Sequence, residues 1–273
     1  MAVRQRMGKR RERDRRLPPG RRRSLVMLAL GSATLVMAAF VRDGAVAKPA
    51  ATSRVPDAVV SVTRVLGASV RHRRISVVER GDPDTPAKEL VVGCIHGNEP
   101  AGIAIAEQLE SVALNREAGL WVVEDANPDG VAADTRTTAD GVDLNRNFPW
   151  RWYRHGRPGD PHFSGPRPLS EPESRLLADL IRRLRPRVTI WFHQPLAVVD
   201  ESGGNARLEQ RYASLVGLPF RRLPRYSGGA TDWQNARFPH TTAFVVELPQ
   251  RPLSAQAVRR YARAATELIQ PSR

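Results

Sequence analysis

The chain has 273 residues, of which 43 are Lys or Arg and 28 are Asp or Glu, so its net charge is +15, and 41% of the residues are hydrophobic. The single cysteine excludes a disulfide scaffold, and the hydrophobic content excludes a wholly disordered chain. Residues 1–23 hold 11 basic and 2 acidic side chains, whereas residues 48–273 hold 31 and 25. Most of the excess positive charge therefore belongs to the N-terminal segment.

This basic segment precedes an apolar run from Leu25 to Val41, followed by small residues at Ala45 and Ala47. Such an order is typical of an export signal, so residues 1–47 are predicted to direct export, with cleavage before Lys48. The apolar run lies at the lower limit for spanning a bilayer, which leaves permanent anchoring by residues 25–41 as the alternative. We expect membrane contact only through this segment and an extracellular or cell-wall location.

The same basic segment has two further interpretations. Arg22 and Arg23 match a loose twin-arginine pattern, which leaves the export route open. The run could also be an arm that binds nucleic acid, but a basic run next to an apolar segment is usually a topology signal. We therefore expect no nucleic-acid partner.

Residues 48–58 are rich in Ala, Pro and Ser and lack an apolar period, which is typical of a linker. From Val59 to Arg273, apolar strand-like runs alternate with helical patterns, without an internal repeat. This alternation predicts one α/β domain over residues 59–273.

The first informative stretch is an apolar run over residues 89–96, which predicts a buried strand that ends in His96. Glu99 then lies on a turn, and Pro100 followed by helix-forming residues predicts a helix over residues 101–109. A His and a Glu three residues apart across a turn can direct their donor atoms to one Zn²⁺. The alternative is a surface carboxylate beside a core histidine.

Two later strands are predicted to end in ionisable residues. Residues 170–173 form a capping box that opens a helix to about Leu184, and residues 187–192 form a buried strand that ends in His193. The last strand, over residues 243–246, ends in Glu247. Ligands of open α/β sheets bind beyond the carboxyl ends of the strands, so these residues together with His96 are predicted to be functional.

The sequence resembles the zinc carboxypeptidase family, and within it the bacterial murein peptide amidases. The matching motifs occur in family order over about residues 75–270: Ile95-His96-Gly97-Asn98-Glu99-Pro100, Asn127-Pro128-Asp129-Gly130, Thr135-Arg136, residues 141–149, Ser164-Gly165-Pro166, Ser170-Glu171-Pro172-Glu173, Phe192-His193 and Val246-Glu247-Leu248-Pro249. The resemblance implies a mixed, mostly parallel β-sheet flanked by helices.

The resemblance also implies a set of catalytic roles. His96, Glu99 and His193 would hold one Zn²⁺ and leave the fourth position for water. Glu247 would be the general base. Arg136 would stabilise the oxyanion of the transition state.

Four further residues are expected to bind substrate. Asn145 and Arg146 match the family pair that holds a substrate carboxylate, so a carboxylate-bearing peptide is the expected partner. Tyr226 resembles the mobile tyrosine of the family, although it lies two residues closer to the following glycine pair than in animal digestive enzymes, and an ordinary loop tyrosine is the alternative. Thr231 would lie at the floor of the specificity pocket, where an uncharged hydroxyl argues against a strong preference for basic side chains.

Asp143 belongs to the motif over residues 141–149, and the resemblance implies that it is a supporting or structural acid near the zinc histidines. The sequence does not show that Asp143 reaches either imidazole. Cys94 is expected to pack as a small hydrophobe. The remaining histidines are expected to be solvated: His72, His155, His162 and His240.

The resemblance, together with the export signal, implies an exported zinc-dependent hydrolase of murein peptides that cleaves the bond between D-glutamate and diaminopimelate. Three alternatives remain: a general metallocarboxypeptidase, an N-acyl amino acid deacylase of the aspartoacylase type, and a catalytically silent peptide-binding module.

Overall fold

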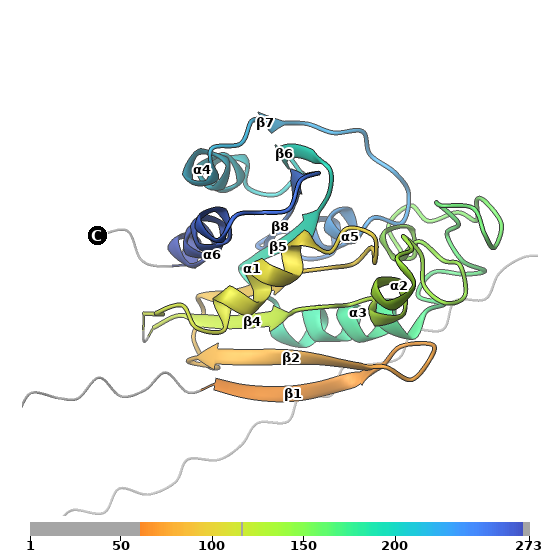
Figure 1. The fold of residues 1–273 in the computed structure, drawn as a ribbon, viewed down its shortest axis with the longest axis horizontal. Coiled ribbons are helices and arrows are strands. Elements are labelled where there is room, and N and C mark those ends of the chain that lie inside the picture. Colours follow the sequence, from red (N-terminus) through yellow and green to blue (C-terminus); the bar gives the residue numbers. More distant parts are fainter. Residues whose placement is uncertain (1–60, 116, 270–273) are drawn as a thin grey trace, which may run out of the picture. The chain divides into compact units, whose positions relative to one another are not determined.

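The computed structural model describes residues 61–115 and 117–269, which fold around one eight-stranded sheet (Figure 1). The predicted leader (1–47), linker (48–58) and domain start at Val59 lie outside these residues. Within the described ranges, no helix is both long and apolar enough to cross a membrane. The strands and helices are β1 (Ser61–Ala68), β2 (Arg74–Gly81), β3 (Lys88–Val92), α1 (Ala101–Leu109), β4 (Gly119–Val123), α2 (Pro128–Ala133), η1 (Leu144–Arg146), α3 (Pro172–Leu184), β5 (Val188–His193), β6 (Leu196–Asp200), α4 (Ala206–Val216), β7 (Phe220–Arg221), α5 (Ala230–Arg237), β8 (Thr242–Pro249) and α6 (Ala255–Ile269).

The sheet is mixed, with the strand order β1-β2-β4-β3-β5-β8-β6-β7. Its centre, β4-β3-β5-β8, is parallel, whereas β1, β2 and β6 run antiparallel to neighbouring strands. This confirms the predicted mixed, mostly parallel sheet. The carboxyl ends of β3, β5 and β8 consequently meet at one edge, where ligands of α/β sheets bind.

Helices cover both faces of the sheet, so its central strands are buried on each side (Figure 1). One face packs against α1, α4 and α6 through side chains that include Ile105, Tyr212 and Tyr261. The other face packs against α3 and α5 through Leu177 and Trp233. Burial on both faces explains why the central strands appear in the sequence as continuous apolar runs.

The predicted elements are largely present, with two changes at strand ends. The helix over residues 101–109 and the strand that ends in His193 are confirmed. The strand predicted over residues 89–96 ends at Val92, so His96 lies on the loop that follows it. The last strand continues beyond Glu247 to Pro249, because Leu196 of β6 pairs with Pro249.

The predicted capping box at residues 170–173 is wrong, although the helix that it was expected to open is present as α3. Glu171 occupies the N-cap position, and no side chain caps the helix. The hydroxyl of Ser170 instead donates to the Glu171 carboxylate at 2.8 Å and accepts from the Asn147 amide at 2.9 Å. The bond to the neighbouring Glu171 and the bond from Asn147 in a distant loop compete with the local cap.

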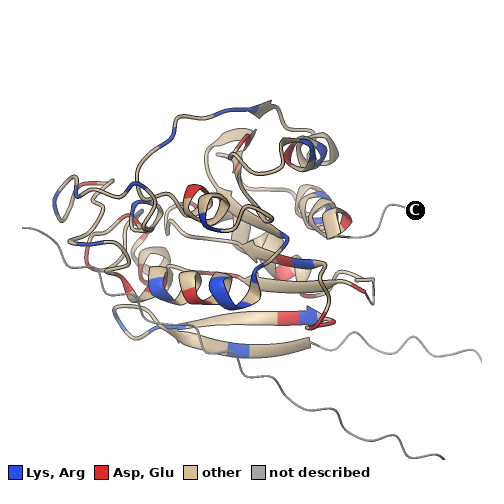
Figure 2. Cartoon of the chain, turned by 180° about the vertical axis from the view of Figure 1, so that it is seen from behind, with Lys and Arg blue, Asp and Glu red and all other residues tan. Residues whose placement is uncertain are grey.

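Figure 2 shows that basic and acidic residues are interspersed along the helices, strands and loops. On α3, for example, Arg182 pairs with Asp179 at 2.8 Å. This distribution agrees with the sequence, in which the excess positive charge is concentrated outside the described residues.

One core residue opposes folding. Glu89 of β3 is fully buried, and neither of its carboxylate oxygens has a hydrogen-bond partner among the described residues. Burial raises the pKa of Glu89 well above its ordinary value. The folded state therefore retains a proton that the unfolded chain releases above about pH 4.3, so this group lowers stability as the pH rises above that value towards the folded-state pKa.

We expect Glu89→Met to raise the free energy of unfolding at pH 7.5 by about 1–3 kcal/mol, because it removes an unpaired buried polar group. Urea unfolding at pH 7.5 and pH 4 measures the effect, and the gain should be smaller at pH 4. Glu89→Gln is the matched control, since it cannot ionise but keeps a buried polar end. An equal gain for Glu89→Met at both pH values is the result that contradicts this interpretation.

Candidate active site

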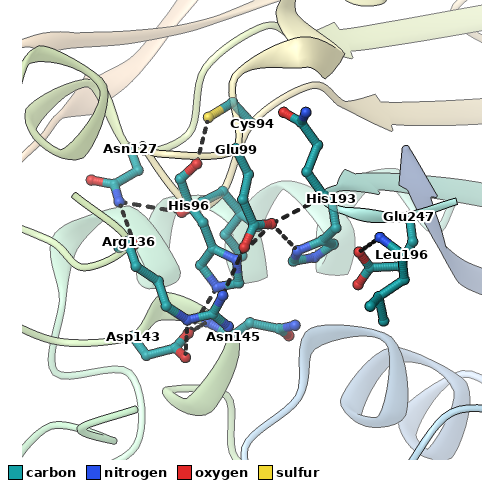
Figure 3. Close-up of polar contacts among 12 residues, drawn as sticks. Cys94, His96, Glu99, Asn127, Arg136, Asp143, Asn145, His193, Leu196 and Glu247 are labelled. Carbon is teal, nitrogen blue, oxygen red and sulfur yellow. Dashed lines mark hydrogen bonds and ion pairs between the residues drawn. The ribbon is translucent and has the colours of Figure 1, made fainter. Parts of the chain in front are cut away.

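Three potential metal ligands meet beyond the carboxyl ends of β3 and β5: His96, Glu99 and His193 (Figure 3). Their ligand atoms all lie within 4.8 Å of one another. The Glu99 Oε2 atom is 3.1 Å from Nδ1 of His96 and 2.9 Å from Nδ1 of His193. Ligands of a tetrahedral zinc ion with bonds near 2.0 Å lie about 3.3 Å apart, so this spacing suits such an ion.

The hydrogen bonding of His96 leaves one ring nitrogen available to a metal. Its Nε2 atom lies 2.9 Å from Oδ1 of Asp143, whereas its buried Nδ1 atom, although 3.1 Å from Glu99 Oε2, makes no hydrogen bond of suitable geometry in the described part of the chain. A carboxylate at Nε2 favours the tautomer in which that nitrogen carries the proton and Nδ1 has a free lone pair. The unpartnered Nδ1 and the mixed nitrogen and oxygen donors therefore fit a zinc ion.

The charges of the site support ligation by an ionised carboxylate. Burial alone would raise the pKa of Glu99, but the imidazoles of His96 and His193 hold it below its ordinary value. Burial likewise opposes ionisation of Asp143, yet contacts with His96, His162 and Arg136 hold its pKa well below the ordinary value. Both carboxylates are therefore charged at neutral pH.

Arg136 lies beside the predicted metal ligands (Figure 3). Its Nη1 atom donates to Glu99 Oε1 at 2.7 Å, and its Nε atom donates to Asp143 Oδ2 at 3.0 Å. The side chain also lines the cavity in front of the triad. The two carboxylates thus fix a guanidinium whose remaining N–H groups are available to a negatively charged ligand.

Two loops are joined so that His96 and Arg136 approach each other. The Asn127 amide donates to the carbonyls of Ile95, at 3.2 Å, and Thr137, at 3.3 Å. Gly97 packs directly on α2, and a Cβ atom at this position would lie 1.9 Å from the carbonyl carbon of Gly130. The glycine after His96 is therefore required for the close approach of the loops.

Glu247 is placed by strand pairing. It lies opposite His193 in the parallel register of β5 and β8, and Figure 3 shows it on the far side of His193 from Glu99. Leu196 donates its N–H to Oε2 of Glu247 at 3.5 Å. Burial raises the pKa of Glu247, while His193 opposes this shift. A carboxylate with a raised pKa beside a metal site is suited to accept a proton.

The predicted carboxylate-binding pair, Asn145 and Arg146, lines the same cavity as the triad. The Asn145 Oδ1 atom accepts from Ala230 N at 2.9 Å, which leaves the amide N–H groups for a ligand. Arg146 is buried, and its guanidinium lies 4.5 Å from the ring centroid of Tyr226. Tyr226 is 54% exposed, so its ring covers Arg146 from the solvent side.

Thr231 is buried and lines the cavity, and its place at the floor of a specificity pocket stays a prediction. The cavity has a volume of about 260 Å³. Its wall also contains three charged residues that the sequence analysis did not identify: Asp200, Arg225 and Asp232. They come from β6, the β7–α5 loop and α5, and no motif connects them.

The structure also defines the surroundings of the triad. Asp143 reaches the imidazole of His96, which the sequence left undecided. His162, expected to be solvated, is 60% exposed, but its Nδ1 atom lies 3.3 Å from Asp143 Oδ2. Cys94 is buried and its thiol donates to the His96 carbonyl at 3.1 Å, while burial raises the pKa of the thiol. These features agree with an inert cysteine.

The parallel sheet edge thus carries a candidate metal site made of a His–Glu–His triad, with the Glu247 carboxylate, the partly exposed Arg136 and the buried Arg146 around the same cavity. The zinc carboxypeptidase family model matches residues 50–205. Murein peptide amidase A of Vibrio campbellii is 31% identical over 189 residues, which cover 63% of this chain and 73% of that protein. The chain belongs to the zinc carboxypeptidase family.

Two Escherichia coli proteins show the extent of the likeness. Murein peptide amidase A of strain K12 is 34% identical over 126 residues, or 41% of this chain, and the chain spans about half the length of that relative (51%). The crystal structure of murein-tripeptide amidase from strain O157 superimposes with a TM-score of 0.63 and 27% identity, covering 77% of this chain and 93% of that one. The fold is therefore zinc carboxypeptidase-like.

Proposed function

We propose that this chain is an exported amidase that binds one zinc ion and cleaves murein peptides at the bond between D-glutamate and diaminopimelate. The proposal rests on one observation: the His–Glu–His triad, Glu247 and the Asn145–Arg146 pair all line the same cavity. A substrate carboxylate bound by this pair would place a nearby amide bond at the triad. The names of the relatives support murein peptides as substrates, and the N-terminal sequence supports export.

His96, Glu99 and His193 would hold the zinc ion, which when bound lowers the pKa of water and polarises a carbonyl group. Glu247 accepts the proton of the attacking water and returns it to the leaving nitrogen. Its hydrogen bond with Leu196 orients one carboxylate oxygen and leaves the other to move the proton. The N–H groups of Arg136 that are not bonded to Glu99 or Asp143 bind the developing oxyanion.

Arg146 binds the substrate carboxylate with its planar donor pair, so Arg146→Lys should lower kcat/KM by about 10- to 100-fold. Most of the loss should appear in KM, because this contact is made in both the ground state and the transition state. Steady-state kinetics on a murein tripeptide measures the change. Arg182→Lys, on the exposed face of α3, is the control. An unchanged KM for Arg146→Lys would remove Arg146 from substrate binding.

The function itself is tested with the zinc-loaded protein and two sets of peptides. We expect release of diaminopimelate from L-Ala-γ-D-Glu-diaminopimelate and little release of C-terminal residues from ordinary L-peptides. N-acetylated amino acids form a third set, which tests the deacylase. Faster hydrolysis of either comparison set overturns the proposal in favour of the corresponding alternative, and no hydrolysis of any set favours a binding module.

A further inference from the structure

Beyond the metal triad, the cavity wall carries a cluster of charged side chains, Asp200, Arg225 and Asp232. Asp200 ends β6, Arg225 lies on the loop after β7, and Asp232 lies in the first turn of α5 (Figure 1). Thr231, expected at the pocket floor, is adjacent to Asp232 along the chain. The cluster therefore lies where the side chain of the leaving residue is expected.

Asp200 is fully engaged within the protein. Its carboxylate accepts from Leu223 N at 2.8 Å and from Ser202 Oγ at 2.7 Å. It also pairs with both terminal nitrogens of Arg225. Only 3% of the Asp200 side chain is exposed. Asp200 consequently acts as an anchor that fixes the Arg225 guanidinium in the cavity wall.

Arg225 keeps donors for a ligand despite this anchoring. Its Nη2 atom donates to Asp200 and to the carbonyl of Glu201, and its Nη1 atom donates once to Asp200. A guanidinium has five N–H groups, so Nε–H and one N–H of Nη1 have no acceptor among the described residues. Arg225 can therefore bind a ligand carboxylate while its ion pair with Asp200 stays intact.

Asp232 faces the same cavity without a hydrogen bond to any described residue. Its nearest cationic atom is Nε of Arg225, 3.8 Å from Oδ1, which is beyond hydrogen-bond range. The Asp232 side chain is only 14% exposed, and burial raises its pKa. A partly buried carboxylate without a hydrogen-bond donor is less well solvated than one in water, and a ligand ammonium would offset this loss.

The Asp232 carboxylate and the Arg225 guanidinium present opposite charges to one ligand. A lysine side chain would satisfy Asp232 but bring its ammonium next to Arg225, and an acidic side chain would bind Arg225 but lie against Asp232. An apolar side chain would leave Asp232 without a hydrogen-bond donor and the free N–H groups of Arg225 without an acceptor. Only an end that carries both an ammonium and a carboxylate satisfies both residues.

We propose that Asp232 and Arg225 are specificity-determining residues that select a leaving residue whose side chain ends in both an ammonium and a carboxylate. Asp232 binds the ammonium, Arg225 binds the carboxylate, and Arg146 binds the carboxylate of the main chain. The inference rests on the proposed function for the position of this residue, and diaminopimelate has the required chemistry.

The test uses three peptides, L-Ala-γ-D-Glu-X, in which X is meso-diaminopimelate, lysine or 2-aminopimelate. Lysine lacks the distal carboxylate, and 2-aminopimelate lacks the distal ammonium. For the zinc-loaded full chain, we expect kcat/KM for diaminopimelate to exceed both others by at least about 10-fold. Asp232→Asn should lower the value for diaminopimelate and lysine by about 10- to 100-fold and should not lower that for 2-aminopimelate, whose distal carboxylate no longer lies against a negative charge.

Arg225→Lys provides the second variant, because it keeps a positive charge beside Asp200 while losing the planar fork. It should lower kcat/KM for diaminopimelate and 2-aminopimelate but not for lysine. Asp179→Asn, on the exposed face of α3, is the matched control and should leave all three values unchanged. Equal losses for all three peptides in Asp232→Asn would indicate a structural role and overturn the inference.

Calorimetric binding of free meso-diaminopimelate, lysine and 2-aminopimelate to the same proteins separates this inference from the proposed function. Selective binding of diaminopimelate that Asp232→Asn abolishes, without cleavage of any peptide, supports the inference and refutes the function. Cleavage of all three peptides with equal kcat/KM supports an amidase and refutes the inference. Binding without selectivity among the three compounds also refutes it.

Discussion

Replacing Glu247 with glutamine lowers kcat by about 10²- to 10⁴-fold, while the protein keeps its zinc. The amide of glutamine has nearly the shape of the carboxylate but cannot accept a proton. The register of β5 and β8 places Glu247 beside His193, and this placement does not depend on contact with His96 or Glu99. Its replacement therefore leaves the triad intact.

Turnover of the murein tripeptide and zinc content, measured on the same preparations, test this expectation. Glu107→Gln, an exposed change on α1, is the control for the loss of one carboxylate. If the variant loses its zinc together with its activity, Glu247 is a ligand or a structural support. If it keeps wild-type turnover, the base is another group.

Replacing Asp143 with asparagine weakens zinc binding by about 10- to 100-fold. The Asp143 carboxylate lies 2.9 Å from Nε2 of His96 and 3.0 Å from Nε of Arg136. Its charge makes the His96 imidazole a stronger donor to a metal and fixes the tautomer with a free Nδ1. An asparagine keeps the size of the side chain but not the charge, so affinity falls while the fold remains.

Competition with a chromophoric chelator gives the zinc dissociation constants. Asp129→Asn is the matched control, since Asp129 is also buried and paired with an arginine, Arg73, but contacts none of the predicted metal ligands. This control should lose stability without losing zinc affinity. Equal zinc affinity in wild type and Asp143→Asn is the outcome that rules out the supporting role of Asp143.

The sequence predicted the elements whose patterns are local. The strand ending in His193 is a continuous apolar run because both faces of the sheet are covered, and the helix over residues 101–109 follows directly from Pro100. The three candidate metal ligands could be predicted because the resemblance connects motifs that are far apart in the chain. Tertiary contacts then bring His96, Glu99 and His193 together, as expected.

Other features depend on contacts that leave no local pattern. The extension of β8 to Pro249 arises from pairing with β6, and the loss of the predicted cap on α3 arises from the bond between Ser170 and Asn147. Arg225 and Asp232 face one cavity only because the β7–α5 loop and α5 fold against β6. The resemblance identified Thr231 as the pocket residue, but the charged residue Asp232 lies next to it in the chain.

All of the proposed chemistry depends on the binding of one zinc ion by His96, Glu99 and His193. X-ray diffraction from crystals of the zinc-loaded protein, recorded on both sides of the zinc absorption edge, locates the ion. We expect one anomalous peak per chain, about 2.0–2.2 Å from a nitrogen of each histidine and an oxygen of Glu99. The absence of a peak at these residues, with zinc bound elsewhere or not at all, would contradict it.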